Sequence, residues 1–242
     1  MSWNGGFPRA LTPGNIILTH VGAFDGSDCD DRFATPCTDN VMGHTYLDEY
    51  RLDGTLVQSI NLNNLPVPMS QAYFTGGTGP SEGLISTSLD GRFLIFGGYN
   101  APLGWGVKNT TVNGVGAAVP ASWPAGAPSA PRVFARLGAD GALGVIATAT
   151  DTFQYDTLRS ACSVDGNSVY AVGHGVIPKD QSGAVIPGRN GSVHFFTAGA
   201  TSTTAVILDG TFAVSTDAAG NARGCLISSP DRLAHPVHQH AR

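Results

Sequence analysis

The chain has 242 residues and a formal net charge of −5; only 13% of its residues are charged, whereas 42% are hydrophobic. No cluster of Lys or Arg supplies the basic surface that nucleic acid or an anionic membrane requires, and no apolar run reaches the roughly 18 residues that span a bilayer, so nucleic-acid binding and membrane insertion are not expected. The 32 Gly and 15 Pro favour strands and turns, and the length suits one all-β domain.

The first polar segment, residues 25–37, concentrates carboxylates between two cysteines or beside them. The carboxylates are Asp25, Asp28, Asp30 and Asp31. They could coordinate calcium through oxygen ligands, although the sixth position holds Asp30 where a helix–loop–helix calcium loop needs Gly. The other interpretation is a solvated turn closed by a Cys29–Cys37 disulfide, which we predict because so short a loop is easily bridged. No other cofactor is expected.

The predicted disulfide bears on the compartment of the protein. Disulfides persist in oxidising surroundings, and two triplets of the glycosylation type begin at Asn109 and Asn190. The lysine content is low as well. We therefore expect an extracellular location or another oxidising compartment.

Two types of strand pair alternate along the chain, and most turn at Asp-Gly. The outer type comes first, with strands on both sides of Asp53-Gly54; the inner type follows in residues 81–100, around Asp90-Gly91. Asp-Gly between alternating apolar residues is a strong hairpin signal. The outer type returns at Asp140-Gly141 and the inner type at Asp165-Gly166. This alternation predicts antiparallel units of four strands.

The spacing of the inner turns indicates a β-propeller. Asp90 and Asp165 are 75 positions apart, and 44 remain after the Pro-, Ala- and Gly-rich insertion 101–131 is removed. Four-stranded propeller blades repeat every 40 to 50 residues or so. The predicted fold is an all-β, partial β-propeller of four-stranded antiparallel blades.

The predicted domain covers residues 1–242 and holds too few blades for a closed ring. Its parts are an incomplete blade 14–65, a blade 81–150 with the insertion 101–131, a blade 156–209, the start of a further blade at 211–234, and an irregular tail 235–242. A propeller needs at least four blades. The chain could be a fragment, could close its ring with another copy, or could be a truncated propeller, which is the interpretation that we favour. Unpaired blade faces could then make copies of the chain associate.

The repeats resemble a group of uncharacterised, often secreted, seven-bladed β-propeller-like proteins. The resemblance is carried by Leu-Asp-Glu-Tyr and Leu-Val-Gln within 46–62, and by the Asp-Gly hairpins of 82–100 and 158–175, the last with Arg-Ser before its turn. These segments make up about a quarter of the chain. The resemblance implies a disc with a central funnel and implies no reaction.

Candidate ligand residues lie where the inner strands enter the funnel. Glu82 and Arg223 lie eight positions before their turn Asp, and Arg159 lies six before its own. They could bind a sugar or a small polar ligand through bidentate hydrogen bonds, or pair with one another as a structural network. Tyr99 and His174 occupy equivalent positions after successive second strands, where an acid and a base could meet or where both could simply cap loops.

The remaining candidates are aromatic residues and histidines. Trp105 and Trp123 in the insertion 101–131 could stack on a sugar or anchor a protein, or could pin the insertion to the disc. His20, His44 and His194 lie in strand-like runs and are interpreted as core or rim residues. The terminal His235, His238 and His240 could chelate a metal, but histidines on an irregular terminus more often do nothing.

We therefore expect a non-enzymatic module that recognises a glycan or a protein through the propeller loops and funnel. The alternative is a carbohydrate-active enzyme, a polysaccharide lyase or hydrolase, that uses Tyr99 and His174. No nucleophile elbow, phosphate-binding loop or Cys-x-x-Cys pair is present. An enzyme is therefore the less favoured interpretation.

Overall fold

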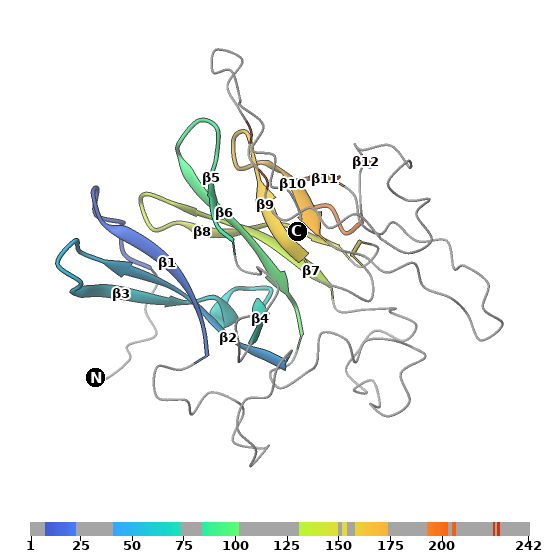
Figure 1. Ribbon diagram of the computed structural model, residues 1–242. Coiled ribbons are helices and arrows are strands. Elements are labelled where there is room, and N and C mark those ends of the chain that lie inside the picture. Colours follow the sequence, from blue (N-terminus) through green and yellow to red (C-terminus); the bar gives the residue numbers. More distant parts are fainter. Residues whose placement is uncertain are drawn as a thin grey trace, which may run out of the picture.

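The computed structural model is an all-β protein of antiparallel sheets, shown in Figure 1. It describes residues 8–22, 41–73, 84–101, 131–149, 152–153, 158–173, 193–202, 205–206, 225 and 227. The strands are β1 (Ile16–Val21), β2 (Val41–Tyr50), β3 (Leu56–Asn61), β4 (Ser70–Tyr73), β5 (Ser86–Thr87), β6 (Phe93–Tyr99), β7 (Arg132–Gly138), β8 (Leu143–Ala149), β9 (Leu158–Cys162), β10 (Ser168–Gly173), β11 (Val193–Thr197) and β12 (Ala205–Val206). A short 3₁₀ helix, η1 (Leu62–Asn64), follows β3.

The hairpins turn where Gly adopts a left-handed backbone. Gly54, Gly91, Gly141, Gly166 and Gly199 have φ between 73° and 84°, a region that costs other L-residues about 1–2 kcal/mol. The first four follow Asp, whose carboxylate accepts the backbone N–H of the residue after Gly at 2.9–3.1 Å. The chemistry of the Asp-Gly pair therefore explains the position of each of these four turns.

Two sets of four strands follow one another along the chain. One set is β5–β6–β7–β8 and the other is β9–β10–β11–β12, each paired antiparallel along the chain. A smaller group precedes them, with β1 and β3 on the two sides of β2. In chain order, we call β1–β3 the first group, β5–β8 the second group and β9–β12 the third group. In Figure 1 these three groups lie side by side, with β1–β3 at one end and β9–β12 at the other.

Strand β4 joins the first group to the second, which the repeat pattern does not predict. It pairs with the first half of β2 and, through Ser70 opposite Tyr99, with the end of β6, so that an eight-stranded sheet results. A Cβ on Gly98 would lie 2.8 Å from the Ser70 carbonyl oxygen, so only glycine permits this approach. Among the described residues neither sheet closes on itself.

Two apolar cores hold the three groups together. The first core lies between β1–β3 and one face of β6–β8, and includes Leu47, Ile60, Phe96 and Leu137. The second lies between the other face of β6–β8 and the group β9–β12, and its buried residues are Met42, Ile95, Tyr99, Phe134, Ile146, Ala147, Ala149, Phe153, Leu158, Ala161, Val169, Ala171 and Phe196. Because side chains alternate along a strand, β6 contributes Phe96 to the first core and Ile95 to the second.

Polar contacts join the second and third groups at their turns. Ser86 Oγ donates to the Ala161 carbonyl at 2.8 Å, and the Leu89 N–H donates to the Ser163 carbonyl at 3.0 Å. Arg136 Nη1 donates to the Gly166 carbonyl at 2.6 Å. These bonds fix how far one sheet can slide along the other.

Glu49 binds the N-terminal segment to the first group. Its carboxylate accepts hydrogen bonds from the Thr12 N–H at 2.8 Å, from Asn15 Nδ2 at 2.6 Å and from Gln58 Nε2 at 2.7 Å. Burial by itself raises the pKa of Glu49, but the bonds from Gln58, Thr12 and Asn15 outweigh it and hold that pKa below its usual value. The ionised carboxylate therefore stabilises the fold.

Replacing Glu49 by Gln is expected to lower the free energy of unfolding at pH 7 by about 1–3 kcal/mol, because a buried amide cannot accept all three bonds. A group whose pKa is lowered by folding stabilises the fold above its unfolded pKa of about 4.5 and loses this effect as the pH falls through the lower, folded value. Glu49→Gln should therefore flatten the loss of stability below about pH 4.5. Urea unfolding of both proteins from pH 7 to pH 3 measures this, and parallel pH profiles would contradict it.

Candidate functional site

The ends of three equivalent strands meet at one rim of the protein. β1, β6 and β10 end at Val21, Tyr99 and Gly173, and the next described strands begin at Val41, Arg132 and Val193. We call the three intervening stretches of sequence, residues 22–40, 100–131 and 174–192, the connections. These strands hold the same place in their groups, since each pairs with the strand that begins an outer hairpin. The three connections therefore begin at equivalent strand ends.

A chain of neighbouring residues links the three strand ends. The Gly22 N–H donates to the His44 carbonyl at 2.8 Å, His44 pairs with Ser70, and Ser70 pairs with Tyr99. The Tyr99 hydroxyl accepts the Leu158 N–H at 2.7 Å, and Leu158 pairs with Gly173. We name these residues the connection rim: Gly22, His44, Ser70, Tyr99, Leu158 and Gly173. All three connections begin there.

Tyr99 lies at the centre of the connection rim and is 1% exposed. The Arg132 guanidinium lies 4.9 Å from its ring centroid, and Arg132 donates a hydrogen bond to the Phe153 carbonyl. Arg132 is itself buried. A cation that lies over an aromatic ring away from water contributes about 2 kcal/mol or more to stability. The contacts of Tyr99 therefore join β6, β7 and β9.

Phe153 marks a strained point beside the rim. Its φ is 47°, in the left-handed region that favours glycine, and its side chain is fully buried. The ring meets His194 edge-on, with 4.8 Å between centroids. Such a conformation persists where the surroundings over-determine it. Here the hydrogen bond from Arg132 and the core around the ring hold it.

Two of the predicted site residues lie in the described part of the chain, and both are buried. Tyr99 is described above, and Arg159 follows Leu158 in β9, with 6% of its surface exposed. The others lie outside the described residues: Glu82, Arg223, His174, Trp105, Trp123, Asp25, Asp28, Asp30, Asp31, Cys29 and Cys37. The pairing of Tyr99 with His174 stays a prediction, as does the Cys29–Cys37 disulfide.

A polar cluster on β1–β3 was not singled out from the sequence. His20 Nδ1 lies 3.3 Å from Asp48 Oδ2, Ser59 Oγ donates to Asp48 Oδ1 at 2.5 Å, and the His20 ring stacks on Tyr46 with 5.3 Å between centroids. Burial, and then the charge of Asp48, raise the pKa of Tyr50. The alternation Tyr46-Leu-Asp-Glu-Tyr50 could have placed these side chains on one face, but nothing in the sequence pairs them with His20.

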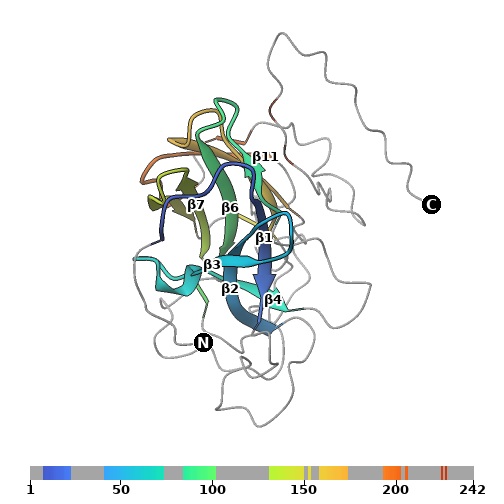
Figure 2. The same cartoon turned by 90° about the vertical axis from the view of Figure 1, so that its left-hand side faces the viewer.

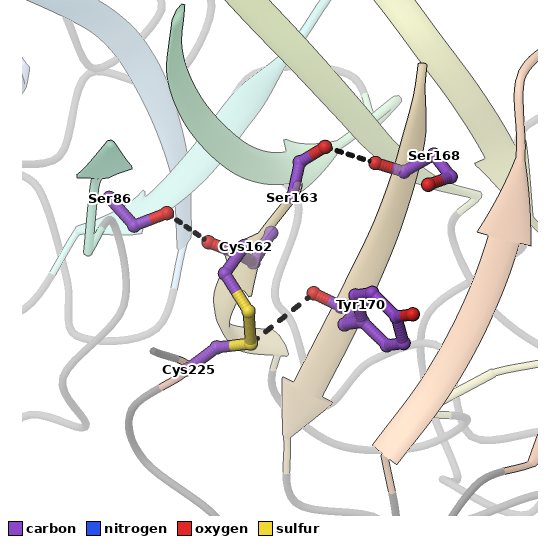
Figure 3. The surroundings of a disulfide bond; sticks show 7 residues. Ser86, Cys162, Ser163, Ser168, Tyr170 and Cys225 are labelled. Carbon is purple, nitrogen blue, oxygen red and sulfur yellow. Dashed lines mark hydrogen bonds between the residues drawn. A yellow bond between two sulfur atoms is a disulfide. The ribbon is translucent and has the colours of Figure 1, made fainter. Parts of the chain in front are cut away.

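A disulfide joins Cys162 of β9 to Cys225, 63 positions further along the chain (Figure 3). Cys162 is 2% exposed, and Cys225 Sγ lies 3.6 Å from the Tyr170 carbonyl oxygen. This pairing was not predicted from the sequence. The sequence does hold one indication that the two cysteines occupy similar places. Cys162 follows Arg159 by three positions and Cys225 follows Arg223 by two, each in an inner-strand segment. The pair fits an oxidising compartment.

Within the described ranges, no group of three or more His, Cys, Asp or Glu side chains is placed to hold a metal ion. The described part of the chain also contains no helix long and apolar enough to cross a membrane. No protein-family model, curated protein or solved structure matches the chain.

Proposed function

We propose that the protein is a non-enzymatic binding module that recognises a glycan or a protein through its long connections. The observation that carries the proposal is the connection rim, where the ends of β1, β6 and β10 are linked by pairing and hydrogen bonds. Loops that leave a rigid scaffold at one rim are a common way to build a binding surface. The strands supply the scaffold, and the connections supply the contacts.

We propose further that the scaffold is part of a β-propeller. Two four-stranded sets follow one another in the same order, and the inner strand segments of the two sets run parallel, with Leu84 beside Ser160. Inner strands of successive propeller blades are neighbours in this way around a common axis. On this proposal the rim is one face of a disc, and Arg159, Glu82 and Arg223 line its funnel.

The candidate contact residues are distributed over the connections. Residues 22–40 contain Asp25, Asp28, Asp30 and Asp31, residues 100–131 contain Trp105 and Trp123, and residues 174–192 begin with His174. Indole rings stack on the apolar faces of sugars or fill pockets in protein partners, while carboxylates accept hydrogen bonds from hydroxyl groups. With an oxidising compartment, which the Cys162–Cys225 disulfide supports, the proposed setting is extracellular.

Titration with neutral and uronic-acid-containing polysaccharides, followed by tryptophan fluorescence and calorimetry, tests the proposal. Replacing Trp105 and Trp123 together by Ala should weaken binding at least tenfold, because buried aromatic anchors contribute about 2 kcal/mol or more. Leu52→Ala is the control, since Leu52 is 80% exposed in the β2–β3 turn, at the opposite strand ends from the rim. Equal affinities for the double variant and the control would contradict the role of the connections.

The Tyr99→Phe variant separates binding from catalysis. It removes the oxygen that accepts the Leu158 N–H, so the free energy of unfolding should fall by about 1–3 kcal/mol. Polysaccharide affinity should stay unchanged at temperatures where the variant is folded. The wild type could instead cleave polysaccharide, with this activity lost in both Tyr99→Phe and His174→Ala. That result would show that the protein is an enzyme and would contradict the binding module.

A further inference from the structure

The segment that precedes β1 is held by two strand groups at once. Residues 8–15 lead from the β7–β8 turn to the start of β1, and Figure 2 shows this dark blue trace beside the hairpin of β7 and β8. The Leu11 N–H donates to the Ala139 carbonyl at 2.8 Å, and the Leu11 side chain packs against the first core. The segment therefore bridges the first and second groups at the turn end of the strands, away from the connection rim.

Gln58 of β3 binds the main chain of Arg9. Its Oε1 accepts the Arg9 N–H at 3.0 Å, and its Nε2 donates to the Arg9 carbonyl at 3.1 Å. The same Nε2 donates to the fully buried Glu49 at 2.7 Å. Because a carboxylate can only accept, this bond fixes which end of the amide faces each group of Arg9. An amide held in this way pairs with the main chain of an extended peptide, whatever the side chain at that position.

Two further contacts hold the main chain at neighbouring residues. The Thr12 N–H donates to Glu49 Oε1 at 2.8 Å. Gly141 has a φ of 84°, and a Cβ there would lie 2.6 Å from the carbonyl oxygens of Pro8 and Arg9, so only glycine lets the segment lie this close. We name the residues that bind the segment the segment site: Glu49, Val57, Gln58, Ala139 and Gly141.

The side chains of Arg9 and Leu11 add sequence preference to this main-chain recognition. Arg9 Nη2 donates to the Val57 carbonyl at 2.7 Å, and Leu11 is half-buried against the first core, whereas Ala10 between them is exposed. A segment that buries so little apolar surface opens at a lower free energy than a core strand does. Residues 8–12 can therefore leave the segment site while the sheets stay folded.

We propose that the segment site binds an extended segment of another protein, one that carries Arg and, two residues later, Leu. Residues 8–12 occupy the site as an intramolecular ligand, and the partner segment displaces them. Where extended peptides are recognised, main-chain hydrogen bonds supply affinity and contacts with alternate side chains supply specificity. The segment site lies at the opposite strand ends from the connection rim, so the two binding sites are independent.

A peptide with the sequence of residues 8–12, acetylated and amidated, tests the proposal by titration into the full chain, followed by calorimetry and NMR. Leu11→Asp loosens the resident segment and should bind the peptide with a Kd of about 0.1 mM. The wild type should bind about tenfold more weakly, because its own segment competes at an effective concentration on the order of 1 mM. Arg9→Ala loosens the segment in a second way, in case Leu11→Asp fails to fold.

Changes to Gln58 and to the peptide show whether the main chain is recognised. Gln58→Ala, added to Leu11→Asp, should weaken binding at least about tenfold, because both bonds to the peptide main chain are lost. A peptide that is N-methylated at its Arg should lose affinity likewise and leaves the protein unchanged. The control is Val164→Ala, added to Leu11→Asp, because Val164 is 40% exposed in the distant β9–β10 turn; it should bind the peptide like Leu11→Asp alone.

Two results would overturn the proposal directly: equal affinity for the N-methylated and unmodified peptides, or no saturable binding to a folded Leu11→Asp or Arg9→Ala variant. Wild-type dimers that the peptide dissociates would assign the site to a second copy of this chain and overturn an external partner. Failure of polysaccharide binding at the connection rim would leave peptide binding unchanged, so the two proposals are tested separately.

Discussion

Gly166→Ala should destabilise the protein by about 2–5 kcal/mol, at least about twice as much as the same change at Gly54. Both glycines follow Asp in a hairpin and both have positive φ, 78° and 84°. The left-handed backbone by itself costs alanine about 1–2 kcal/mol at either place. The two positions differ in what a Cβ atom meets.

At Gly166 the added Cβ would lie 2.6 Å from Phe93 Cδ2 and 3.1 Å from Arg136 Cδ, whereas at Gly54 nothing lies within 4 Å. Phe93 cannot move away easily, because the Arg136 guanidinium lies 4.8 Å from its ring centroid and Arg136 also bonds to the Gly166 carbonyl. Overpacking of this kind costs about 1–3 kcal/mol in addition.

Urea unfolding of Gly166→Ala, Gly54→Ala and the wild type measures the difference directly. We expect a much lower urea midpoint for Gly166→Ala, because the substitution weakens the packing of the native state. The slope should be unchanged, because the surface that unfolding exposes stays the same. Equal losses in the two variants would mean that the β9–β10 turn does not pack against β6 and β7 as described.

Replacement of Cys162 and Cys225 together by Ser should lower the free energy of unfolding by about 2–4 kcal/mol. The disulfide closes a loop with a sequence separation of 63, and removing it restores conformational freedom to the unfolded chain. It is also a covalent link between β9 and the part of the chain that follows β12, so the third group depends on it most.

The matched control is the double variant of Cys29 and Cys37, together with the wild type unfolded in the presence of dithiothreitol. The Cys162/Cys225 variant should be insensitive to the reductant if the Cys29–Cys37 bridge contributes nothing, and any remaining sensitivity measures that second bridge. Mass spectrometry of non-reduced peptides identifies the pairs. A Cys162/Cys225 variant as stable as the oxidised wild type would contradict the expected role of the bond.

The local structure followed from short stretches of sequence. Asp-Gly at positions 53, 90, 140 and 165 specifies where the chain reverses, because Gly permits positive φ and the Asp carboxylate binds the N–H two residues on. Alternation of apolar and polar residues then assigns side chains to faces, as for Leu47 and Asp48. Antiparallel sheets, the two hairpin types and their order could all be predicted in this way.

What depends on contacts between distant residues could not be predicted. The burial of Tyr99, its hydrogen bond from Leu158 and its cation–π contact with Arg132 require three strands to meet, so a residue that resembles a catalytic candidate in sequence belongs to the packing of the rim. The link through β4 depends on a close approach at Gly98.

Sequence alone therefore determined the turns, the strand faces and the repeated order of the hairpins, since each rests on residues a few positions apart. Tertiary structure decided which strand ends share a rim, that Cys162 pairs with Cys225, and that His20 meets Asp48. The physical reason is that Cys162 and Cys225 are 63 positions apart, Tyr99 and Leu158 are 59 apart, and His20 and Asp48 are 28 apart. The geometry of such contacts is determined by how whole sheets pack rather than by local propensity.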